Sequence, residues 1–323
     1  MSSPAFDTAT LLLRIAAKQE IARDIFRFEL TLPDGGDLPE FTAGAHVSLR
    51  TPGGLIRKYS LCNDPDERER YVIAVKREDP GEGGSLSLTR DANVGDLIEV
   101  GEPRNDFPLA KNVQNHLFIA GGIGITPIYS MMQHLKSTGE GRFKLYYLTR
   151  EPDLTAFREE LKSSAYAGQV VIHHDHGDLN KALDLWPILE KPMGRHLYCC
   201  GPRGLMEAVR DMSGHWSSAA VHFEDFGSSK PAHKPDDKPF TVRLARSGRS
   251  VEIPADVSIL DTLRAEGVAV SSSCESGTCG SCRTKLLEGE AEHRDLVLTE
   301  REQAGNIMIC VSRAKSDTLV LDL

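Results

Sequence analysis

The sequence contains no apolar run that approaches the roughly 18 to 20 residues that a membrane-spanning helix needs. Its first residues, Met1-Ser2-Ser3-Pro4, lack the basic and apolar regions of a secretory signal peptide. Internal repeats and low-complexity tracts are also missing, which excludes a repeat architecture. The sequence therefore predicts neither a membrane span nor export, and we expect a cytoplasmic protein.

An excess of positive charge is also missing. Lys and Arg number 38 against 47 Asp and Glu, for a formal net charge of -9 at pH 7. This balance argues against binding to nucleic acid or to anionic membranes, because both attract basic surfaces. It permits a protein partner that presents a complementary basic face.

The cysteines do not follow the pattern of a disulfide framework. Their number, 7, is odd, and the adjacent Cys199 and Cys200 are poorly placed to form disulfides. Such usage is typical of a reducing compartment. We predict that Cys62 and Cys199 are core thiols, because a free cysteine usually packs as a small apolar residue.

Four cysteines share a spacing that indicates metal chemistry. Cys274, Cys279 and Cys282 are spaced C-x4-C-x2-C, and Cys310 follows far downstream. This is the plant-type pattern in which four thiolates hold a 2Fe-2S cluster. Glycines and small residues in the loop let the backbone fold tightly and turn its amides toward the sulfurs. A zinc site with four thiolates is the alternative, although zinc ribbons usually bring two close cysteine pairs. The spacing therefore predicts an electron carrier.

The length of 323 residues predicts two or three domains. Residues 228–239, rich in Pro, small and charged residues, form the predicted linker. After it, alternating residues predict a hairpin over 240–253, and apolar periodicity predicts a helix over 259–265. We therefore predict an α+β ferredoxin domain of the plant type over residues 240–323.

The middle of the chain, residues 109–227, alternates predicted strands with predicted helices. Such alternation is typical of an α/β domain in which helices cover a parallel sheet. It is also the architecture of a nucleotide-binding domain. The predicted strands cover residues 116–120, 143–148, 169–172, 196–200 and 220–223, and predicted helices cover 128–135 and 205–212.

The first part of the chain, residues 1–108, contains short alternating strands separated by Gly and Pro turns. Such a pattern predicts an antiparallel β-barrel. Examples of the predicted strands are residues 25–30, 46–50 and 71–76.

A glycine-rich loop follows the first predicted strand of the α/β domain. Residues 120–127 (AGGIGITP) open a helix, where free amides and the helix dipole favour a pyrophosphate. A second strand end, residues 199–202 (CCGP), lies at the same carboxyl edge of the predicted sheet. A tight strand-to-helix turn without a ligand is the alternative for the first loop.

The predicted barrel carries a comparable pair of motifs. Residues 57–60 (RKYS) combine a cation for phosphate, a ring that can cover a flat flavin, and a hydroxyl. Residues 81–85 (GEGGS) supply glycines ahead of a predicted helix start, which is a second phosphate cradle. The alternatives are a basic turn for the first motif and a surface hairpin loop for the second.

Taken in order, these motifs resemble the phthalate dioxygenase reductase family over nearly the whole chain. That family joins a flavin barrel, a nicotinamide domain and a carboxyl-terminal plant-type ferredoxin. Several motifs are shared across the wider ferredoxin reductase superfamily, but their combination and order are more specific. The resemblance rests on residues 57–63, 74–77, 121–127, 147–150, 199–202, 222–227 and the cysteine loop 274–282.

The resemblance implies FMN, NADH and a 2Fe-2S cluster as cofactors, and it implies which residues contact them. The implied FMN contacts are Arg57, Lys58, Tyr59, Ser60, Ala74, Val75 and Lys76, with Gly84 and Ser85 at the phosphate and Thr126 and Phe226 at the isoalloxazine. The implied NAD contacts are Gly121, Gly122, Gly124, Thr149, Arg150, Cys200, Gly201 and Pro202. FAD in place of FMN stays open, as does NADPH, whose extra phosphate would require a cation such as Arg150.

The resemblance further implies a reductase component that passes electrons from NADH to a Rieske-type oxygenase. Nicotinamide gives up two electrons together as hydride, whereas the cluster accepts one at a time, so a flavin must stand between them. Hydride transfer itself requires no catalytic acid or base. We expect a monomer. The alternatives are a reductase for another aromatic oxygenase or a demethylase, a redox carrier or sensor without sustained turnover, and a zinc-stabilised binding module.

Overall fold

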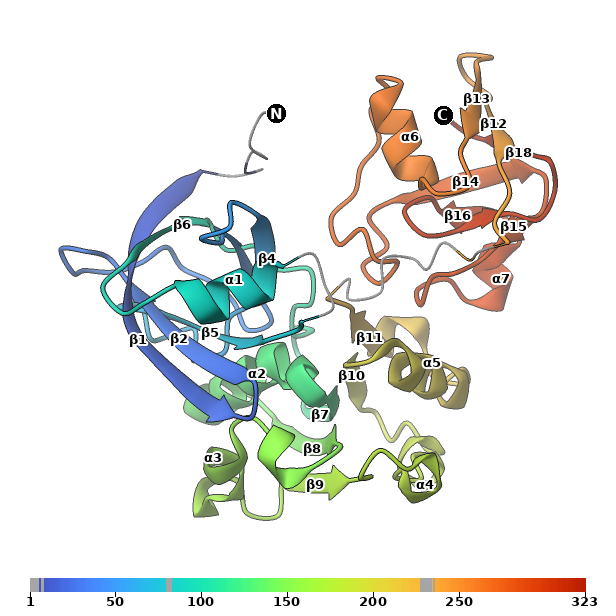
Figure 1. The fold of residues 1–323 in the computed structure, drawn as a ribbon. Coiled ribbons are helices and arrows are strands. Elements are labelled where there is room, and N and C mark those ends of the chain that lie inside the picture. The colour runs from blue at the N-terminus through green and yellow to red at the C-terminus, as the bar shows by residue number, and fades with distance from the viewer. Residues whose placement is uncertain (1–5, 7–8, 80–82, 227–233, 235) are drawn as a thin grey trace. The chain divides into compact units, whose positions relative to one another are not determined.

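The chain folds into two compact units, which are shown in Figure 1. The computed structural model describes residues 6, 9–79, 83–226, 234 and 236–323. One unit comprises Met1–Leu205 with Ala220–His222, and the other comprises Met206–Ala219 with Phe223–Leu323. Most of the predicted linker, residues 228–239, lies outside the described residues. The domain boundaries given above therefore stay predictions.

The first unit begins with a six-stranded antiparallel sheet in the order β4-β3-β6-β1-β2-β5. A bridge between Leu61 and Ile73 joins its two ends, so the sheet closes into the predicted barrel. Leu88, from the helix beside the barrel, is buried in the barrel core with Leu13 and Phe28. The elements are β1 (Thr10–Ala22), β2 (Ile25–Thr31), β3 (His46–Arg50), β4 (Ile56–Ser60), β5 (Tyr71–Lys76), α1 (Gly84–Asp91) and β6 (Leu97–Gly101).

The barrel is followed by a five-stranded sheet in the order β11-β10-β7-β8-β9. Its strands β10, β7, β8 and β9 run parallel, as the sequence predicts for an α/β domain. Their carboxyl ends therefore meet at one edge, where α/β sheets bind ligands. The elements are β7 (Asn115–Gly121), α2 (Ile125–Thr138), β8 (Arg142–Thr149), α3 (Arg158–Lys162), β9 (Val170–His174), α4 (Trp186–Leu189), β10 (His196–Cys200), α5 (Arg203–Met212) and β11 (Val221–Glu224).

The barrel and the parallel sheet share one hydrophobic core. Cys62 of the barrel belongs to the same buried cluster as Phe118 of β7. Two side chains of α2 also hold the chain that follows β4: Ser130 Oγ donates to the Asn63 carbonyl at 2.8 Å, and Gln133 Nε2 donates to the Cys62 carbonyl. These contacts fix the barrel motifs relative to the start of α2.

The second unit contains a mixed five-stranded sheet in the order β13-β12-β18-β14-β16, with a small β15-β17 pair. Helix α6 packs Ile259 and Leu263 into the core of this sheet, and the Ser258 side chain caps its start by accepting from the Asp261 amide at 3.0 Å. The elements are β12 (Phe240–Leu244), β13 (Ser250–Ile253), α6 (Ile259–Ala265), β14 (Arg283–Glu288), β15 (Ala291–Glu292), α7 (Glu300–Gln303), β16 (Asn306–Met308), β17 (Arg313–Ala314) and β18 (Thr318–Leu321).

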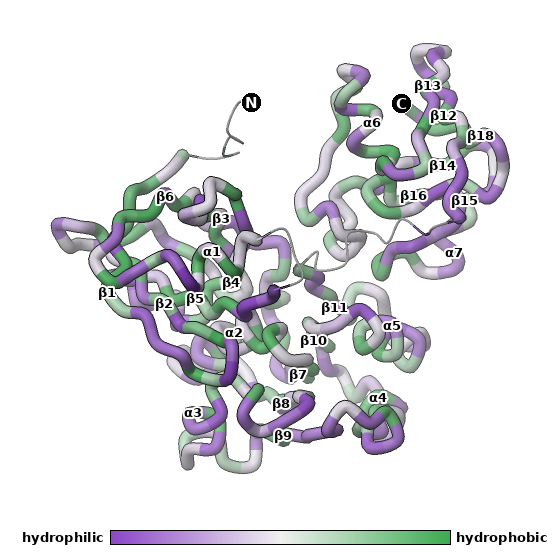
Figure 2. The backbone as a smooth tube through the Cα atoms, viewed as in Figure 1, coloured by the Kyte–Doolittle hydropathy of each residue, from purple (hydrophilic) through white to green (hydrophobic). Residues whose placement is uncertain are grey.

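Hydrophobic and hydrophilic residues alternate along many of the strands, as Figure 2 shows by the change from green to purple along the tube. Strand β8 is an example, because every second residue from Phe143 to Thr149 is buried. Among the described residues, no helix combines the length and the apolar character that crossing a membrane requires.

Candidate functional site

The four predicted cluster ligands come together in the second unit as two pairs of sulfur atoms. Cys282 Sγ and Cys310 Sγ lie 3.1 Å apart, although 28 residues separate them in the sequence. The Cys274 amide donates to Cys279 Sγ at 3.4 Å, and the Cys274 and Cys279 side chains are themselves hydrogen-bonded. The fold therefore gathers four thiols from one loop and one distant segment.

Polar hydrogens of the loop face these sulfurs. The Ser276 amide donates to Cys274 Sγ at 3.5 Å, and the Ser281 hydroxyl lies 3.0 Å from Cys279 Sγ. Hydrogen bonds to cluster sulfurs are one means by which a protein adjusts the reduction potential of a cluster. The small residues of the loop thus have an electrostatic role besides a steric one.

One glycine of this loop has a strict steric role. Gly277 has a φ of +77°, and a Cβ atom there would lie 2.7 Å from Val311 Cγ2 and 3.2 Å from the Asp295 Cα. The Gly277 carbonyl also accepts from the Leu296 amide at 2.9 Å. The loop is therefore held tightly against the segments 295–296 and 310–311.

The pairing of the thiols bears on the choice of metal. A 2Fe-2S cluster has two irons and takes four thiolates, two for each iron, whereas structural zinc needs four ligands around one ion. Two pairs of thiols thus fit the two-iron cluster better than one zinc ion.

The barrel brings Arg57 of β4 to the start of α1. Gly84 is the first residue of that helix, and a Cβ atom there would lie 2.8 Å from Arg57 Cγ and 2.9 Å from Arg57 Nε. Among the described residues, no side chain caps the start of α1. Free helical amides beside a guanidinium form a site suited to a phosphate group.

Ser85, the other residue predicted at this phosphate, is tied to the chain after β5. Its Oγ accepts from the Glu78 amide at 3.2 Å. Lys76, at the end of β5, forms an exposed ion pair with Glu78 at 3.2 Å. The motif residues Gly81 and Glu82 lie outside the described residues.

Strands β4 and β5 present the remaining predicted flavin residues. Ser60 is buried, and its Oγ has no hydrogen-bond partner among the described residues. A buried hydroxyl without a partner is costly, and a polar ligand atom would satisfy it. Burial raises the pKa of the Tyr59 phenol to about 12, so this ring stays neutral at physiological pH. Ala74 and Val75 are buried, whereas Lys58 is exposed.

The carboxyl edge of the parallel sheet brings the two glycine motifs together. A Cβ atom on Gly121 would lie 2.6 Å from Pro202 Cδ, and one on Gly201 would lie 2.9 Å from the Gly121 Cα. A Cβ atom on Gly124 would lie 2.3 Å from the Cys200 carbonyl oxygen. These three glycines are required because the two loops pack backbone to backbone.

Gly122, by contrast, faces open space. It has a φ of +53°, and a Cβ atom there would meet nothing within 4 Å. Thr126 is buried in the first turn of α2, and its hydroxyl donates to the Ile123 carbonyl at 3.0 Å. A backbone approached from open space at the start of a helix suits the close approach of a nucleotide phosphate.

The other residues predicted at NAD lie in different surroundings. Thr149 is buried at the end of β8, and its hydroxyl bonds to Thr155 Oγ1 and His174 Nδ1, each at 2.8 Å. Arg150 is exposed directly after the strand, and Cys200 is fully buried. Phe226 belongs to the second unit and is 42% exposed, so its flavin contact stays a prediction.

Two buried polar residues of the first unit were not among the predicted site residues. Asn63 is buried, and its Nδ2 donates hydrogen bonds to three backbone carbonyls of the following turn. Its Oδ1 accepts from the Val72 amide at 3.0 Å. Thr51 is buried at the end of β3, and its hydroxyl has no partner among the described residues. Asn63 ends the RKYSLCN motif and had a sequence signal, whereas Thr51 sits in an ordinary Thr-Pro-Gly-Gly turn.

Three family models match the chain in the order of its parts. They are the oxidoreductase FAD-binding domain over residues 12–108, the oxidoreductase NAD-binding domain over 118–211 and the 2Fe-2S iron-sulfur cluster binding domain over 242–315. The phthalate 4,5-dioxygenase oxygenase reductase subunit of Pseudomonas putida is 57% identical over 323 residues, covering 100% of this chain and 99% of the relative. This chain belongs to the phthalate dioxygenase reductase family.

Two further members of the phthalate dioxygenase reductase family agree over the full length. Phthalate dioxygenase reductase of Burkholderia cepacia is 56% identical, and the alignment covers 100% of this chain and 100% of the relative. A solved phthalate dioxygenase reductase, described as a modular structure for electron transfer from pyridine nucleotides to [2Fe-2S], has 56% identity and a TM-score of 0.70, covering 97% of this chain and 98% of that one. This chain is therefore an oxidoreductase with flavin-binding, NAD-binding and 2Fe-2S domains, as its sequence predicts.

Proposed function

We propose that this protein is the NADH-dependent reductase component of a Rieske-type aromatic-ring oxygenase system, with FMN between NADH and the cluster. The strongest support for this proposal is that one chain carries three features together. They are the two pairs of cysteine thiols, Arg57 beside the start of α1, and the glycine loops at the carboxyl edge of the parallel sheet. A flavin-free carrier would need neither of the last two. A zinc-binding module would not need paired thiols.

The residues divide the work between three sites. Arg57 and the free amides of α1 would hold the flavin phosphate, and the Ser60 hydroxyl would bond a polar atom of the isoalloxazine ring. Gly122 would let the nicotinamide dinucleotide approach the start of α2. Once bound, the flavin converts the two-electron hydride transfer into single-electron transfer, which the cluster requires.

The choices of FMN and NADH rest on different grounds. FMN rests on the family resemblance, and it needs only the single phosphate cradle at α1. NADH is favoured by Glu151, which follows Arg150 and whose Oε2 lies 3.0 Å from His176 Nδ1. A carboxylate at this position disfavours the additional phosphate of NADPH, although Arg150 itself would favour it.

The partner is proposed from the relatives. The two curated relatives are named as reductases of phthalate dioxygenases, and an oxygenase component would receive the electrons here too. The aromatic substrate would bind that component, so a reductase for another aromatic oxygenase or a demethylase is the second candidate. Buried free thiols at Cys62 and Cys199 support a cytoplasmic location, and we propose a monomer.

An anaerobic titration with NADH tests the proposal. We expect bleaching of the flavin absorbance, a low-temperature paramagnetic resonance signal of a reduced 2Fe-2S cluster, and release of FMN on denaturation. Released FAD, or faster reduction by NADPH, would contradict the cofactor assignments. A cluster that stays oxidised under excess NADH would instead favour the carrier or sensor.

A cysteine variant tests whether the cluster site is independent of the flavin and NAD sites. Cys310→Ser should lose or destabilise the cluster, because the Cys310 sulfur forms one of the two thiol pairs together with the Cys282 sulfur. Flavin content and flavin reduction by NADH should be retained, because the residues predicted to contact the flavin and NAD lie in the first unit, with the exception of Phe226. Loss of flavin reduction in this variant would contradict the assignment of separate sites.

A further inference from the structure

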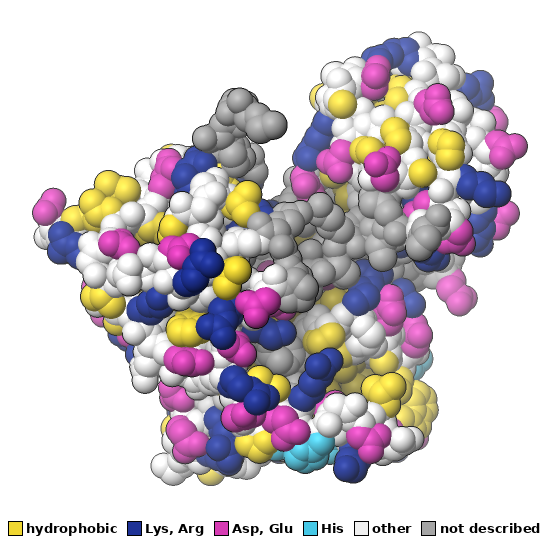
Figure 3. Space-filling model, viewed as in Figure 1, with side chains coloured by type: hydrophobic (Ala, Val, Ile, Leu, Met, Phe, Trp, Pro, Cys, Tyr) yellow, Lys and Arg dark blue, Asp and Glu magenta, His cyan; other side chains and the backbone are white. Residues whose placement is uncertain are grey.

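Asp295 is a buried carboxylate in the segment that packs against the cysteine loop. Its side chain is fully buried, and its Oδ2 accepts from the Val297 amide at 3.1 Å and from the Leu298 amide at 2.7 Å. These two hydrogen bonds close a turn over residues 295–298, the supporting turn. On the face shown in Figure 3, other acidic side chains of the ferredoxin domain lie among Lys and Arg at the surface. Asp295 instead binds backbone amides in the interior.

Among the described residues, Asp295 pairs with no Lys or Arg side chain. The neighbouring cation, Arg294, donates to Asp237 and Glu292. The other carboxylate oxygen of Asp295, Oδ1, lies 3.7 Å from His293 Nδ1, which is too far for a hydrogen bond. Both of these atoms are buried without a hydrogen-bond partner in the described part of the chain. Because such an oxygen costs stability, stabilisation alone does not account for a carboxylate at this position.

The supporting turn contacts the cysteine loop at two glycines. The Leu296 amide donates to the Gly277 carbonyl at 2.9 Å, and the Asp295 Cα lies 3.2 Å from the position of a Cβ atom on Gly277. Val297 Cγ1 lies 3.5 Å from the position of a Cβ atom on Gly280. The cysteine loop therefore packs on the turn that the Asp295 carboxylate closes.

Gly277 connects the supporting turn to a cluster ligand. Its carbonyl is held by the Leu296 amide, and its own amide is hydrogen-bonded to the Cys310 side chain. Glycine has the freest backbone of all residues, and Gly277 adopts a φ of +77°. The direction of the Gly277 amide therefore depends on the contact that holds its carbonyl.

An amide that faces a ligand sulfur and a nearby carboxylate have opposite effects on a cluster. Reduction adds a negative charge, so the amide dipole favours the reduced form and raises the reduction potential. A carboxylate favours the oxidised form and lowers the potential. Substitutions that treat the charge and the hydrogen bonds of Asp295 separately can thus distinguish the two effects.

We propose that Asp295 is a positioning residue for the cluster: it holds the supporting turn, and thereby keeps the Gly277 amide on the Cys310 sulfur and raises the reduction potential. This inference rests on the function proposed above, in which the cluster receives electrons from the flavin. Asp295 acts through backbone groups, and it is not a cluster ligand.

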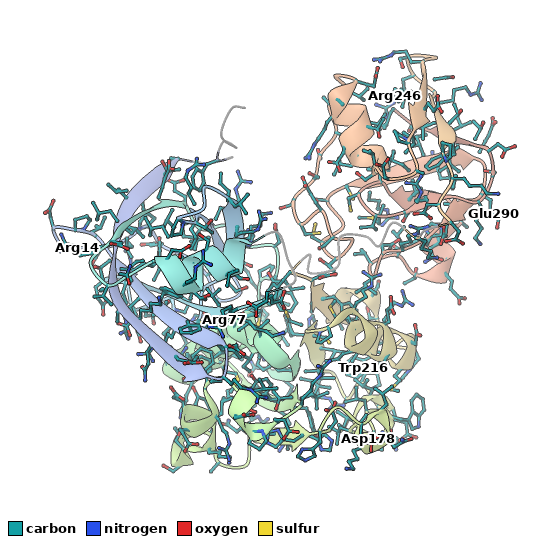
Figure 4. All side chains as sticks on the ribbon, in the orientation of Figure 1. Arg14, Arg77, Asp178, Trp216, Arg246 and Glu290 are labelled. Carbon is teal, nitrogen blue, oxygen red and sulfur yellow. The ribbon has the colours of Figure 1, made fainter. Side chains whose placement is uncertain are left out.

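The test compares two substitutions of Asp295 in the full-length holoprotein. Asp295→Asn retains an oxygen that can accept from the same two amides, whereas Asp295→Ala removes it. Both variants lack the charge, so the difference between them measures the positioning effect. Asp322→Asn and Asp322→Ala are the matched controls. They remove a carboxylate that accepts from Arg246 Nε at 2.9 Å, and the Arg246 side chain projects from the surface (Figure 4).

A dye-mediated titration with dithionite, followed by low-temperature paramagnetic resonance, measures the midpoint potential of the cluster. We expect the potential of Asp295→Ala to lie below that of Asp295→Asn. The potential of Asp295→Asn should be equal to that of the wild type or higher, because only the charge is lost. The two Asp322 variants should have the same potential as each other. Dithionite reduces the cluster directly, so the result does not depend on NADH or on the flavin.

Hydrogen–deuterium exchange of the same proteins shows whether the supporting turn is released. Exchange of the Val297 and Leu298 amides should rise about tenfold or more in Asp295→Ala, because each loses a hydrogen bond to a carboxylate. It should stay close to the wild-type rate in Asp295→Asn. If Asp295→Ala fails to hold a cluster, Asp295→Ser takes its place, because a serine hydroxyl closes such a turn more weakly. Its potential should also lie below that of Asp295→Asn.

Two results would overturn the assignment of Asp295. One is an equal potential in the Asn and Ala variants while exchange shows that the turn is released in the second, since the charge alone would then act. The other is unchanged exchange at Val297 and Leu298 in Asp295→Ala. A wild-type cluster that dithionite reduces and excess NADH does not would instead contradict the proposed function.

Discussion

The side chain of Arg57 occupies the space in which a Cβ atom on Gly84 would lie, with its Cγ 2.8 Å and its Nε 2.9 Å from that position. This contact joins strand β4 to the first residue of α1 and sets the guanidinium beside the free amides of the helix. Two features that each suit a phosphate thereby become one site.

Gly84→Ala should weaken FMN binding about tenfold, which corresponds to about 1.4 kcal/mol. The added methyl displaces Arg57, so charge-assisted hydrogen bonds to the phosphate are lost or lengthened. Quenching of flavin fluorescence measures the affinity. Riboflavin, which has no phosphate, should bind both proteins alike. Gly204→Ala is the control, because a Cβ atom at Gly204 meets nothing within 4 Å.

Ser60→Ala should leave the stability of the apoprotein unchanged or slightly raised. The Ser60 hydroxyl is buried without a partner among the described residues, so its removal takes away a desolvation cost. In the holoprotein the same change should shift the flavin absorption bands and weaken flavin binding by about 1 kcal/mol. Thermal unfolding with and without flavin tests both statements. Equal destabilisation of the two forms would contradict the role assigned to this hydroxyl.

Gly277→Ala should abolish or severely reduce cluster incorporation. The substitution forces a left-handed backbone on alanine and places a methyl 2.7 Å from Val311 Cγ2. Gly280→Ala is the matched comparison, since Gly280 also has a positive φ, of +83°, but its nearest contact would be at 3.5 Å. Iron and sulfide content should fall much further in the first variant. Equal losses would show that backbone strain alone decides the outcome.

The stability of the first unit should fall as the pH drops from 6.5 to about 4. Burial, followed by the nearby His196 and His116, lowers the pKa of His222 from 6.5 to about 4, and the pKa values of His196 and His116 are also lowered by burial. The unfolded chain therefore binds more protons than the folded chain within this window, and protonation favours unfolding. His222 stacks on Tyr198 at 4.4 Å between ring centroids.

His222→Phe tests this pH dependence, because it retains an aromatic ring on Tyr198 and removes the titrating group. Urea unfolding followed by circular dichroism at pH 7 and pH 5 should show a smaller loss of stability in the variant. The free energy of unfolding should depend less steeply on pH, by an amount that corresponds to at most one proton taken up on unfolding. An identical slope would mean that His222 does not titrate in this range. His196, whose Nδ1 lies 3.0 Å from His222 Nε2, would then be the next group to replace.

The sequence predicts the regular elements well where the alternation of residues is unbroken. The strands predicted over 46–50, 71–76 and 196–200 coincide with β3, β5 and β10, and the helix predicted over 259–265 coincides with α6. Strand β1 was not predicted, although it is 13 residues long. Its register shifts between Ile15 and Ala17 and again between Glu20 and Ala22, and these irregularities interrupt the alternation on which the prediction depends.

The sequence by itself determined the four cysteines, the two glycine motifs and the RKYS motif, because their chemistry depends on residue type and local spacing. Only the tertiary structure decided which of these residues meet. It pairs Cys282 with Cys310 across 28 residues and Asp237 with Arg294 across 57, and it leaves the Ser60 hydroxyl without a partner among the described residues. The physical reason is that spacing along the chain fixes only near neighbours, whereas the packing of distant strands and helices sets the distances on which electron transfer and ligand binding depend.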